Sequence, residues 1–161
     1  MDDKTFVAET LNHARAVGFL ISVFVSKLTA RAITHDQSKL NNPEYDIFKE
    51  YTPKLRALTY GSEEYKACLG EMAKGLEHHY VNNRHHPEYF KSDIPEASGI
   101  KNMNLVDLVE MFCDWKAATL RHKDGDIFKS IEQNQKRFGY SDDLKQIFMN
   151  TVALLEPYET K

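Results

Sequence analysis

Apolar residues recur every three or four positions along most of the chain, which is the period of an amphipathic α-helix. In the first part of the chain these positions are Phe6, Leu11, Val17, Leu20, Ile21, Phe24, Leu28 and Ile33. They predict one long helix, or two helices that meet near residues 18–22. The alternation of apolar and polar residues that is typical of strands is nearly missing. We therefore expect an all-α fold.

Helix start and stop signals divide the rest of the chain. Three residues have the side chains and the sequence context of helix N-caps, and they are Ser62, Asn104 and Ser141. We expect the helix after Ser62 to reach about Val81. Gly139 is placed to end the helix before it. Pro43 suits a helix first turn, and Pro53 predicts a further start or a break.

Composition favours one folded domain over residues 1–161, built as a compact bundle of about six helices. The chain has 161 residues, of which 42% are hydrophobic, and a net charge of −3. This balance argues against a protein that binds duplex nucleic acid through a basic surface. Cys68 and Cys113 have no CxxC spacing, and we interpret them as reduced residues of a cytoplasmic protein.

The N-terminus is acidic and does not resemble a signal peptide. The most apolar run, residues 16–25, is too short to span a bilayer, so we expect a buried helix segment and no membrane association. The apolar helices would suit a homodimer.

The stretch "EHHYVNNRHHPEYF" holds four of the seven histidines, as the pairs His78–His79 and His85–His86. Imidazole is the commonest side-chain metal ligand, and clusters of this density are uncommon. The first pair would end a helix, and the second would lie in a long loop over residues 82–102, a kind of loop that is often functional. A solvated, histidine-rich loop is the alternative.

The stretch "THDQSKL" places His35 beside Asp36, with Lys39 on the same helical face as Asp36. The pair offers two metal ligands, and the lysine suits an anionic substrate such as a phosphate. The alternative is a helix C-terminus with an exposed lysine. His13 lies one turn before Val17, where it is either a ligand or a core residue.

The helix predicted after Asn104 has two stripes. Its apolar face contains Leu105, Leu108, Val109, Phe112 and Leu120. A neighbouring stripe contains Asp107, Met111, Asp114, Ala118 and Arg121. Buried carboxylates need a partner or a metal. Asp107 would equally suit a capping pair with Asn104, and Asp114 a surface pair with Arg121.

The order of these residues resembles the HD-domain superfamily of metal-dependent phosphohydrolases. "HDQSK" is similar to the HDxGK form, with Ser38 in place of glycine, and "HHYVNNRHHP" is distantly similar to a stretch of the HD-GYP branch. The pattern "HDxSK…HH…NxHHPEY…DLxEMxCDW" also resembles an uncharacterised family found in bacteria and phages.

The resemblance implies one or two divalent transition-metal ions, Mn, Fe, Co, Ni or Zn. The ligands of the first ion would be His13, His35, Asp36 and Asp107. His78 and His79 would hold a second ion, for which a further histidine is missing and Glu71 is a possible substitute.

The resemblance predicts hydrolysis of a phosphate ester, with a small nucleotide as the favoured substrate. The residues with catalytic roles would be Asp36, Lys39, His78 and His79. Substrate contacts would come from Lys39, Arg84, His85, His86, Asp114 and Arg121, and a base would stack on Tyr80, Tyr89 or Trp115. A di-iron oxygenase with the same ligands and a non-catalytic helical module that binds a nucleotide or a partner are the alternatives.

Overall fold

The structure of the protein is a computed structural model that describes residues 1–59, 62–90, 99–121 and 125–155. The chain divides into two units, residues 1–35 and residues 36–161. Each unit is described by itself. The prediction of one domain over residues 1–161 concerns how these units associate, and it stays a prediction.

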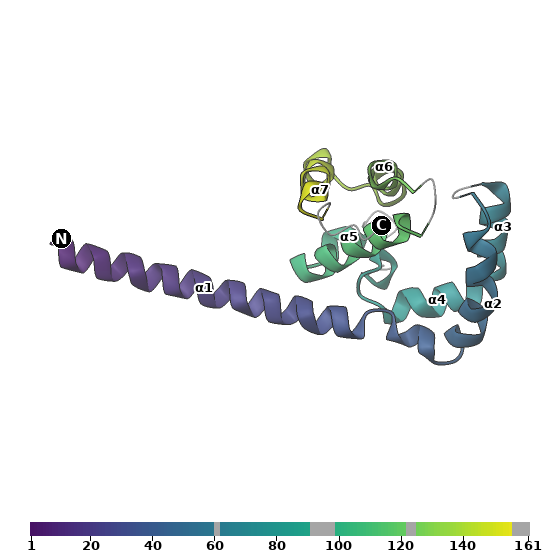
Figure 1. Ribbon diagram of the computed structural model, residues 1–161, viewed down its shortest axis with the longest axis horizontal. Helices are drawn as coiled ribbons and strands as arrows, with labels where there is room; N and C mark the ends of the chain where they lie inside the picture. The colour runs from purple at the N-terminus through teal and green to yellow at the C-terminus, as the bar shows by residue number, and fades with distance from the viewer. Residues whose placement is uncertain (60–61, 91–98, 122–124, 156–161) are drawn as a thin grey trace. The chain divides into compact units, whose positions relative to one another are not determined.

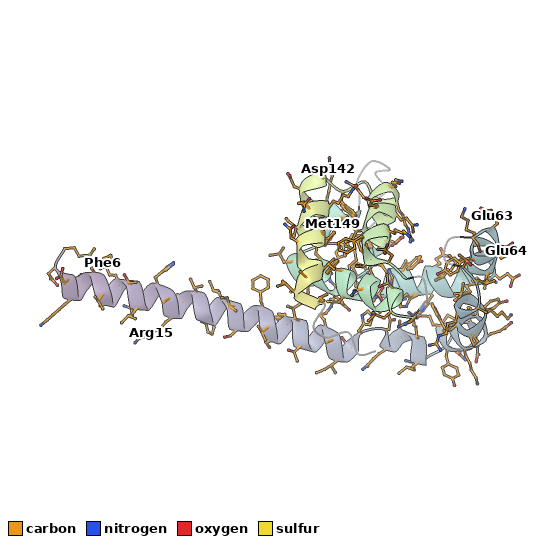
Figure 2. All side chains as sticks on the ribbon, turned by 45° about the horizontal axis from the view of Figure 1, so that its top comes forward. Phe6, Arg15, Glu63, Glu64, Asp142 and Met149 are labelled. Atoms are coloured by element: carbon orange, nitrogen blue, oxygen red, sulfur yellow. The ribbon has the colours of Figure 1, made fainter. Side chains whose placement is uncertain are left out.

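The first unit is a single helix, α1 (Asp3–Thr34), which Asp2 caps by accepting a hydrogen bond from the Thr5 backbone amide at 2.9 Å. The helix runs without a break through residues 18–22, so the prediction of one long helix is confirmed. Figure 2 shows Phe6 and Arg15 projecting from its surface. A single helix has no second layer, so it cannot enclose a core by itself.

The apolar part of α1 is longer than the ten-residue run at its centre. An 18-residue window has a mean hydropathy of 1.6, so α1 is long and apolar enough to cross a membrane by length and composition. Core helices of soluble proteins and signal sequences pass the same test. The prediction of no membrane association stays a prediction.

The second unit contains six α-helices and three short 3₁₀-helices among its described residues (Figure 1). In chain order they are η1 (Gln37–Leu40), α2 (Glu44–Arg56), α3 (Glu63–Glu71), α4 (Ala73–Asn82), η2 (Pro87–Phe90), η3 (Gly99–Asn102), α5 (Leu105–Thr119), α6 (Ile127–Phe138) and α7 (Asp142–Leu155). The described part of the chain has no strand. The all-α prediction is confirmed, with seven α-helices in place of about six.

Three predicted signals work as expected. The Ser62 hydroxyl accepts a hydrogen bond from the Tyr65 amide, and Asn104 forms a capping box with Asp107. Gly139 ends α6 at a φ of 65°, in the left-handed region that favours glycine. Local sequence therefore sets these helix ends.

Two predicted helix boundaries are wrong. The helix after Ser62 does not run unbroken to Val81, because it turns at Met72, which separates α3 from α4. Pro53 neither starts nor breaks a helix, since it lies inside α2, which continues to Arg56. The proline is near the end of α2, so only the last turn follows it.

The apolar core lies where α5, α6 and α7 meet. Its buried residues are Ile100, Met111, Phe112, Ile127, Ile131, Tyr140, Phe148 and Val152. The Phe112 and Phe148 rings stack with their centroids 5.2 Å apart. On α5 the buried residues are Asp107, Met111 and Phe112, whereas Leu105 and Val109 of the helix and Leu120 directly after it are exposed. The predicted apolar face of this helix was therefore displaced from the observed one.

Close approach of α4 to α2 positions the site. Gly75 of α4 has no side chain, and a Cβ atom there would lie 2.9 Å from Cγ2 of Ile47 on α2. The two backbones can therefore pack closely enough for histidines of α4 to reach the start of α2.

Candidate metal centre

Three histidines gather at the end of α4 and in the turn that follows it. His79 belongs to the last turns of α4, and His85 and His86 come directly before η2. One ring nitrogen from each lies within 4.8 Å of those of the other two. His79 and His85 are each only 2% exposed. We call His79, His85 and His86 the histidine cluster.

Asp36 joins the cluster through one carboxylate oxygen. Its Oδ1 lies 3.3 Å from Nε2 of His79 and 3.4 Å from Nε2 of His85. The backbone of Asp36 has a φ of 57°, which is rare for a residue other than glycine, although aspartate tolerates it better than most. Such strain is common at functional sites. Asp36 and the histidine cluster form the candidate metal centre.

A buried carboxylate, Glu44 at the start of α2, orients His79. Its Oε2 lies 2.8 Å from Nδ1 of His79 and accepts a hydrogen bond from the Ser38 hydroxyl at 2.9 Å. Its Oε1 lies 2.7 Å from Nδ1 of His78. Burial acts to raise the pKa of Glu44, but the hydrogen bonds from His78, Ser38 and His79 outweigh it and lower that pKa. An ionised Glu44 is the acceptor that suits a proton on Nδ1 of His79.

Glu110 of α5 stands in the same relation to His85, with its Oε1 3.2 Å from Nδ1. Metal-bound histidines commonly donate their second ring N–H to a carboxylate, which fixes the tautomer and directs the other nitrogen to the metal. Here the two carboxylates come from different helices, and both histidines direct Nε2 to Asp36. This arrangement is typical of a metal centre.

The buried ring nitrogens carry the strongest sign of a bound cation. Among the described residues, Nε2 of His79 and Nε2 of His86 have no hydrogen-bond partner. A neutral His79 with its proton on Nδ1 has a lone pair on Nε2, which would meet the Asp36 carboxylate oxygen at 3.3 Å. Two acceptors at this distance need a proton or a cation between them, and nitrogen and carboxylate oxygen suit a divalent transition metal.

The pKa values of Asp36 and His86 are both shifted in the direction that favours the protonation state of a metal ligand. Burial acts to raise the pKa of Asp36, but the His79 and His85 rings, when their Nε2 atoms carry the proton, and the Lys39 ammonium at 2.6 Å outweigh it and lower that pKa well below the usual range. Burial, together with the charges of the nearby His85 and His79 rings, lowers the pKa of His86 to about 2. At neutral pH Asp36 is therefore ionised and His86 is neutral, as coordination requires.

A cleft of about 560 Å³ has Asp36 in its wall. Among the described residues that line it are four basic side chains, Lys39, Lys49, Arg56 and Arg121, and one carboxylate, Asp36. Lys39 donates a hydrogen bond to Oδ2 of Asp36 at 2.6 Å. We call this space the basic cleft.

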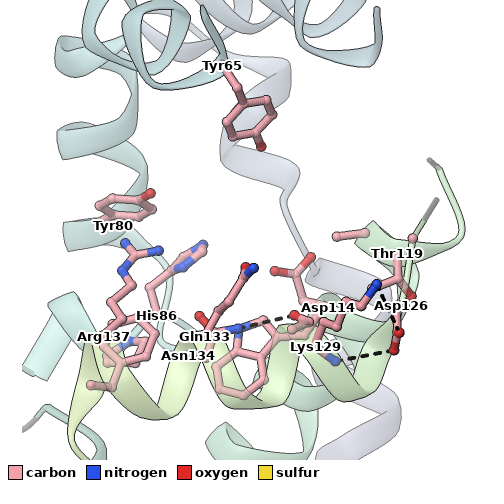
Figure 3. A pocket seen from close by; sticks show the side chains of 16 residues that line it. Tyr65, Tyr80, His86, Asp114, Thr119, Asp126, Lys129, Gln133, Asn134 and Arg137 are labelled. Carbon is pink, nitrogen blue, oxygen red and sulfur yellow. Dashed lines mark hydrogen bonds and ion pairs between the residues drawn. The ribbon is translucent and has the colours of Figure 1, made fainter. Parts of the chain in front are cut away.

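A second cavity, of about 400 Å³, has His86 in its wall (Figure 3). Its charged side chains are balanced, with Asp114 and Asp126 against Lys129 and Arg137. Polar and aromatic residues make up much of the remainder, including Tyr80, Trp115, Gln133 and Asn134. We call it the neutral cavity. Tyr65 and Ala118 line both spaces, so the two adjoin.

The structure brings together only part of the predicted site. Asp36, Lys39, His79, His85 and His86 lie at the candidate metal centre or beside it, and Asp114 and Arg121 line the adjoining spaces. His85 and His86 were predicted as substrate contacts, but the turn after α4 places them with His79. They are therefore candidate ligands.

Asp107 does not take the predicted ligand position. Its carboxylate accepts hydrogen bonds from Nε and Nη2 of Arg84 at 3.1 and 3.0 Å, and from the Asn104 backbone amide. It belongs to none of the candidate metal groups among the described residues. Arg84, predicted to contact substrate, instead pairs with Asp107. The capping alternative for Asp107 was correct.

His13 and His78 also differ from the prediction. His13 and His35 are separated by most of the continuous helix α1, about 33 Å along its axis at about 1.5 Å per residue, so one ion cannot bind both within a chain. His78 turns its Nδ1 to Glu44 and belongs to none of the groups found in the described residues, nor does Glu71. The ligand role of His35 stays a prediction.

Sequence reasoning missed Glu44 and Glu110. Glu110 follows Asp107 by three residues, a spacing that puts both on one side of α5, so it was a detectable candidate. Glu44 gave no signal, because a glutamate in a helix first turn is an ordinary capping residue.

The fold and the site define an all-helical protein with a candidate metal centre of three histidines and one aspartate. Residues 2–157 match the model of a family of unknown function, DUF5662, and the chain belongs to this family. No curated protein and no solved structure matches the chain.

Proposed function

We propose that the protein is a metal-dependent phosphohydrolase that acts on a phosphate ester, with a small nucleotide as the favoured substrate. One observation carries the proposal. A single carboxylate, Asp36, contacts two histidines of the cluster and also lines the basic cleft. Candidate ligands and anion-binding side chains therefore meet at one residue.

Asp36 and the histidine cluster would hold the ion, and Glu44 and Glu110 would orient His79 and His85. His35 precedes Asp36 in the chain and is the additional ligand that the HD resemblance implies. A divalent ion at such a centre polarises a phosphate oxygen and supplies hydroxide near neutral pH.

The basic cleft would bind the phosphate. Lys39 lies 2.6 Å from Asp36, so its ammonium group is placed beside the candidate ligands. Lys49, Arg56 and Arg121 add positive charge that offsets a phosphate dianion, and arginine can bind phosphate oxygens in a bidentate manner. This charge favours an anionic substrate over a neutral one.

The test is a measurement of bound metal and of phosphate release from nucleotides with added Mn, Co, Ni or Mg. We expect metal-dependent release by the wild-type protein, and loss of metal and activity in His35→Ala and Asp36→Ala. Asp143→Ala changes an exposed carboxylate in the first turn of α7 and serves as the matched control. Full activity and metal content in Asp36→Ala would refute the proposal.

A di-iron oxygenase is the second candidate. Glu110 contacts His85, and the charge of Asp114 acts on His86, so α5 brings two further carboxylates to the cluster. Histidine and carboxylate ligands suit iron as well as Mn or Co. An optical or electron-spin signal of paired iron in aerobically purified protein would favour this activity over phosphate release.

A further inference from the structure

We infer that the neutral cavity binds the uncharged ring of the substrate, a nitrogen heterocycle such as a nucleobase, while the phosphate lies in the basic cleft. The inference rests on the proposed function and adds the position and the recognition of the organic group. It assigns ring recognition to the α6 residues Gln133 and Asn134.

The first argument is position. His86 belongs to the histidine cluster and also lines the neutral cavity, just as Asp36 belongs to the centre and lines the basic cleft. Since Tyr65 and Ala118 border both spaces, a ligand at the centre can extend into each. A substrate with a charged end and an uncharged end would then place its ester bond beside the candidate ligands.

The second argument is charge. The neutral cavity has as many acidic as basic side chains among its described lining residues, and both basic side chains are already paired. Nζ of Lys129 lies 3.8 Å from Asp126, and Arg137 donates a hydrogen bond to Glu88 at 2.7 Å. A phosphate would therefore gain much less here than in the basic cleft.

The third argument is hydrogen-bonding chemistry. Gln133 and Asn134 each offer an amide donor and an amide acceptor, which is the pairing that nucleobase edges present. Figure 3 shows Gln133 pointing into the cavity from α6. The Asn134 amide is held by Ser130 at 3.3 Å, so one of the two amides is already oriented. Tyr80 and Trp115 supply aromatic surface, and about 400 Å³ is within the usual range for small-molecule sites.

The experiment measures binding of adenosine, guanosine, cytidine and uridine to the full chain by titration calorimetry, because nucleosides have the ring without the phosphate. We expect at least one to bind, and Gln133→Leu to weaken that binding by about tenfold through the lost amide contacts. Gln133 is exposed, so the replacement leaves the core intact. Gln146→Leu on α7 is the matched control, since Gln146 is exposed and bonds only to Asn150 in the described structure.

Two outcomes would overturn the inference: no nucleoside binds at millimolar concentration, or Gln133→Leu binds as tightly as the wild type. Nucleoside binding needs no turnover, so it separates this inference from the proposed function. If phosphate is released, a second readout compares kcat/KM for the bound nucleoside's 5′-monophosphate with that for ribose 5-phosphate. Gln133→Leu should lower this ratio about tenfold, and an unchanged ratio would contradict ring recognition.

Discussion

The basic cleft and the neutral cavity adjoin, yet they differ in charge. The cleft reaches the candidate metal centre at Asp36 and has four basic side chains, whereas the cavity reaches it at His86 and has balanced charges. A site for a simple inorganic anion would need only the first. The difference suits the substrate that we propose, which has a charged end and an uncharged end.

The two spaces also draw on different helices. Several basic residues of the cleft come from η1 and α2, and the amides of the cavity come from α6. Substitutions on one side can therefore be made without changing the other side directly. This separation makes the comparison open to experiment.

The largest effect is expected from Asp36→Asn, which removes the charge that both the histidines and Lys39 contact. Asparagine tolerates the left-handed backbone of this position, so the fold should persist. Metal affinity should fall by at least about 100-fold, because a charged ligand is lost. Competition with a chelator measures it, and unchanged affinity would remove Asp36 from the centre.

Glu44→Gln should weaken metal binding by about 10- to 100-fold, the usual range for loss of a carboxylate behind a ligating histidine. Glu44 is fully buried, and its oxygens contact both His78 and His79. Glu50→Gln in the same helix is the control, since Glu50 is exposed and pairs with Lys54. If both variants bind metal equally, Glu44 does not orient His79 for coordination.

The double variant Lys49→Gln and Arg121→Gln should raise KM for a phosphate monoester by about tenfold, because two cations leave the basic cleft. The wild-type KM should also rise with salt, and more steeply than that of the variant. The double variant Lys54→Gln and Lys66→Gln, which changes two exposed lysines paired with Glu50 and Glu63, controls for net charge. Equal KM values in all three proteins would place phosphate outside the cleft.

The last prediction concerns folding stability rather than binding, in the segment that bears His85 and His86. A Cβ atom on Gly99 would lie 1.8 Å from the Pro87 carbonyl oxygen, so Gly99→Ala forces η2 and η3 apart. We expect a loss of about 1–3 kcal/mol in the free energy of unfolding. Gly70→Ala meets no atom within 4 Å in α3 and should stabilise by about 0.5–1 kcal/mol. Denaturant unfolding measures both, and equal stabilities would show that the segment adapts without cost.

Much of the fold could be predicted because helix ends depend on local sequence. Ser62, Asn104 and Gly139 act within one turn of their own position, so their effects are visible without tertiary structure. The turn at Met72 and the passage of α2 through Pro53 were not predicted. Both depend on how the helices pack, which overrides weak local preferences.

For the candidate site, the sequence predicts the types of residue more readily than which of these residues lie together. Asp36 and His79 were identified because histidine and aspartate are typical ligands. Asp107 was identified for the same reason, whereas Glu110, which lies on the same side of α5, was missed. Only the tertiary position of Arg84, which pairs with Asp107, distinguishes them. His13 was grouped with His35 because the sequence permitted a break in α1, and the continuous helix removes that grouping.

The most direct test of the account is the metal content per chain, measured by elemental analysis after reconstitution with Mn and desalting. The account predicts one or two ions per wild-type chain and a loss of bound metal in His79→Ala, with His13→Ala unchanged. A wild-type protein that binds no metal would contradict the central claim. So would a His79→Ala variant that retains the full amount.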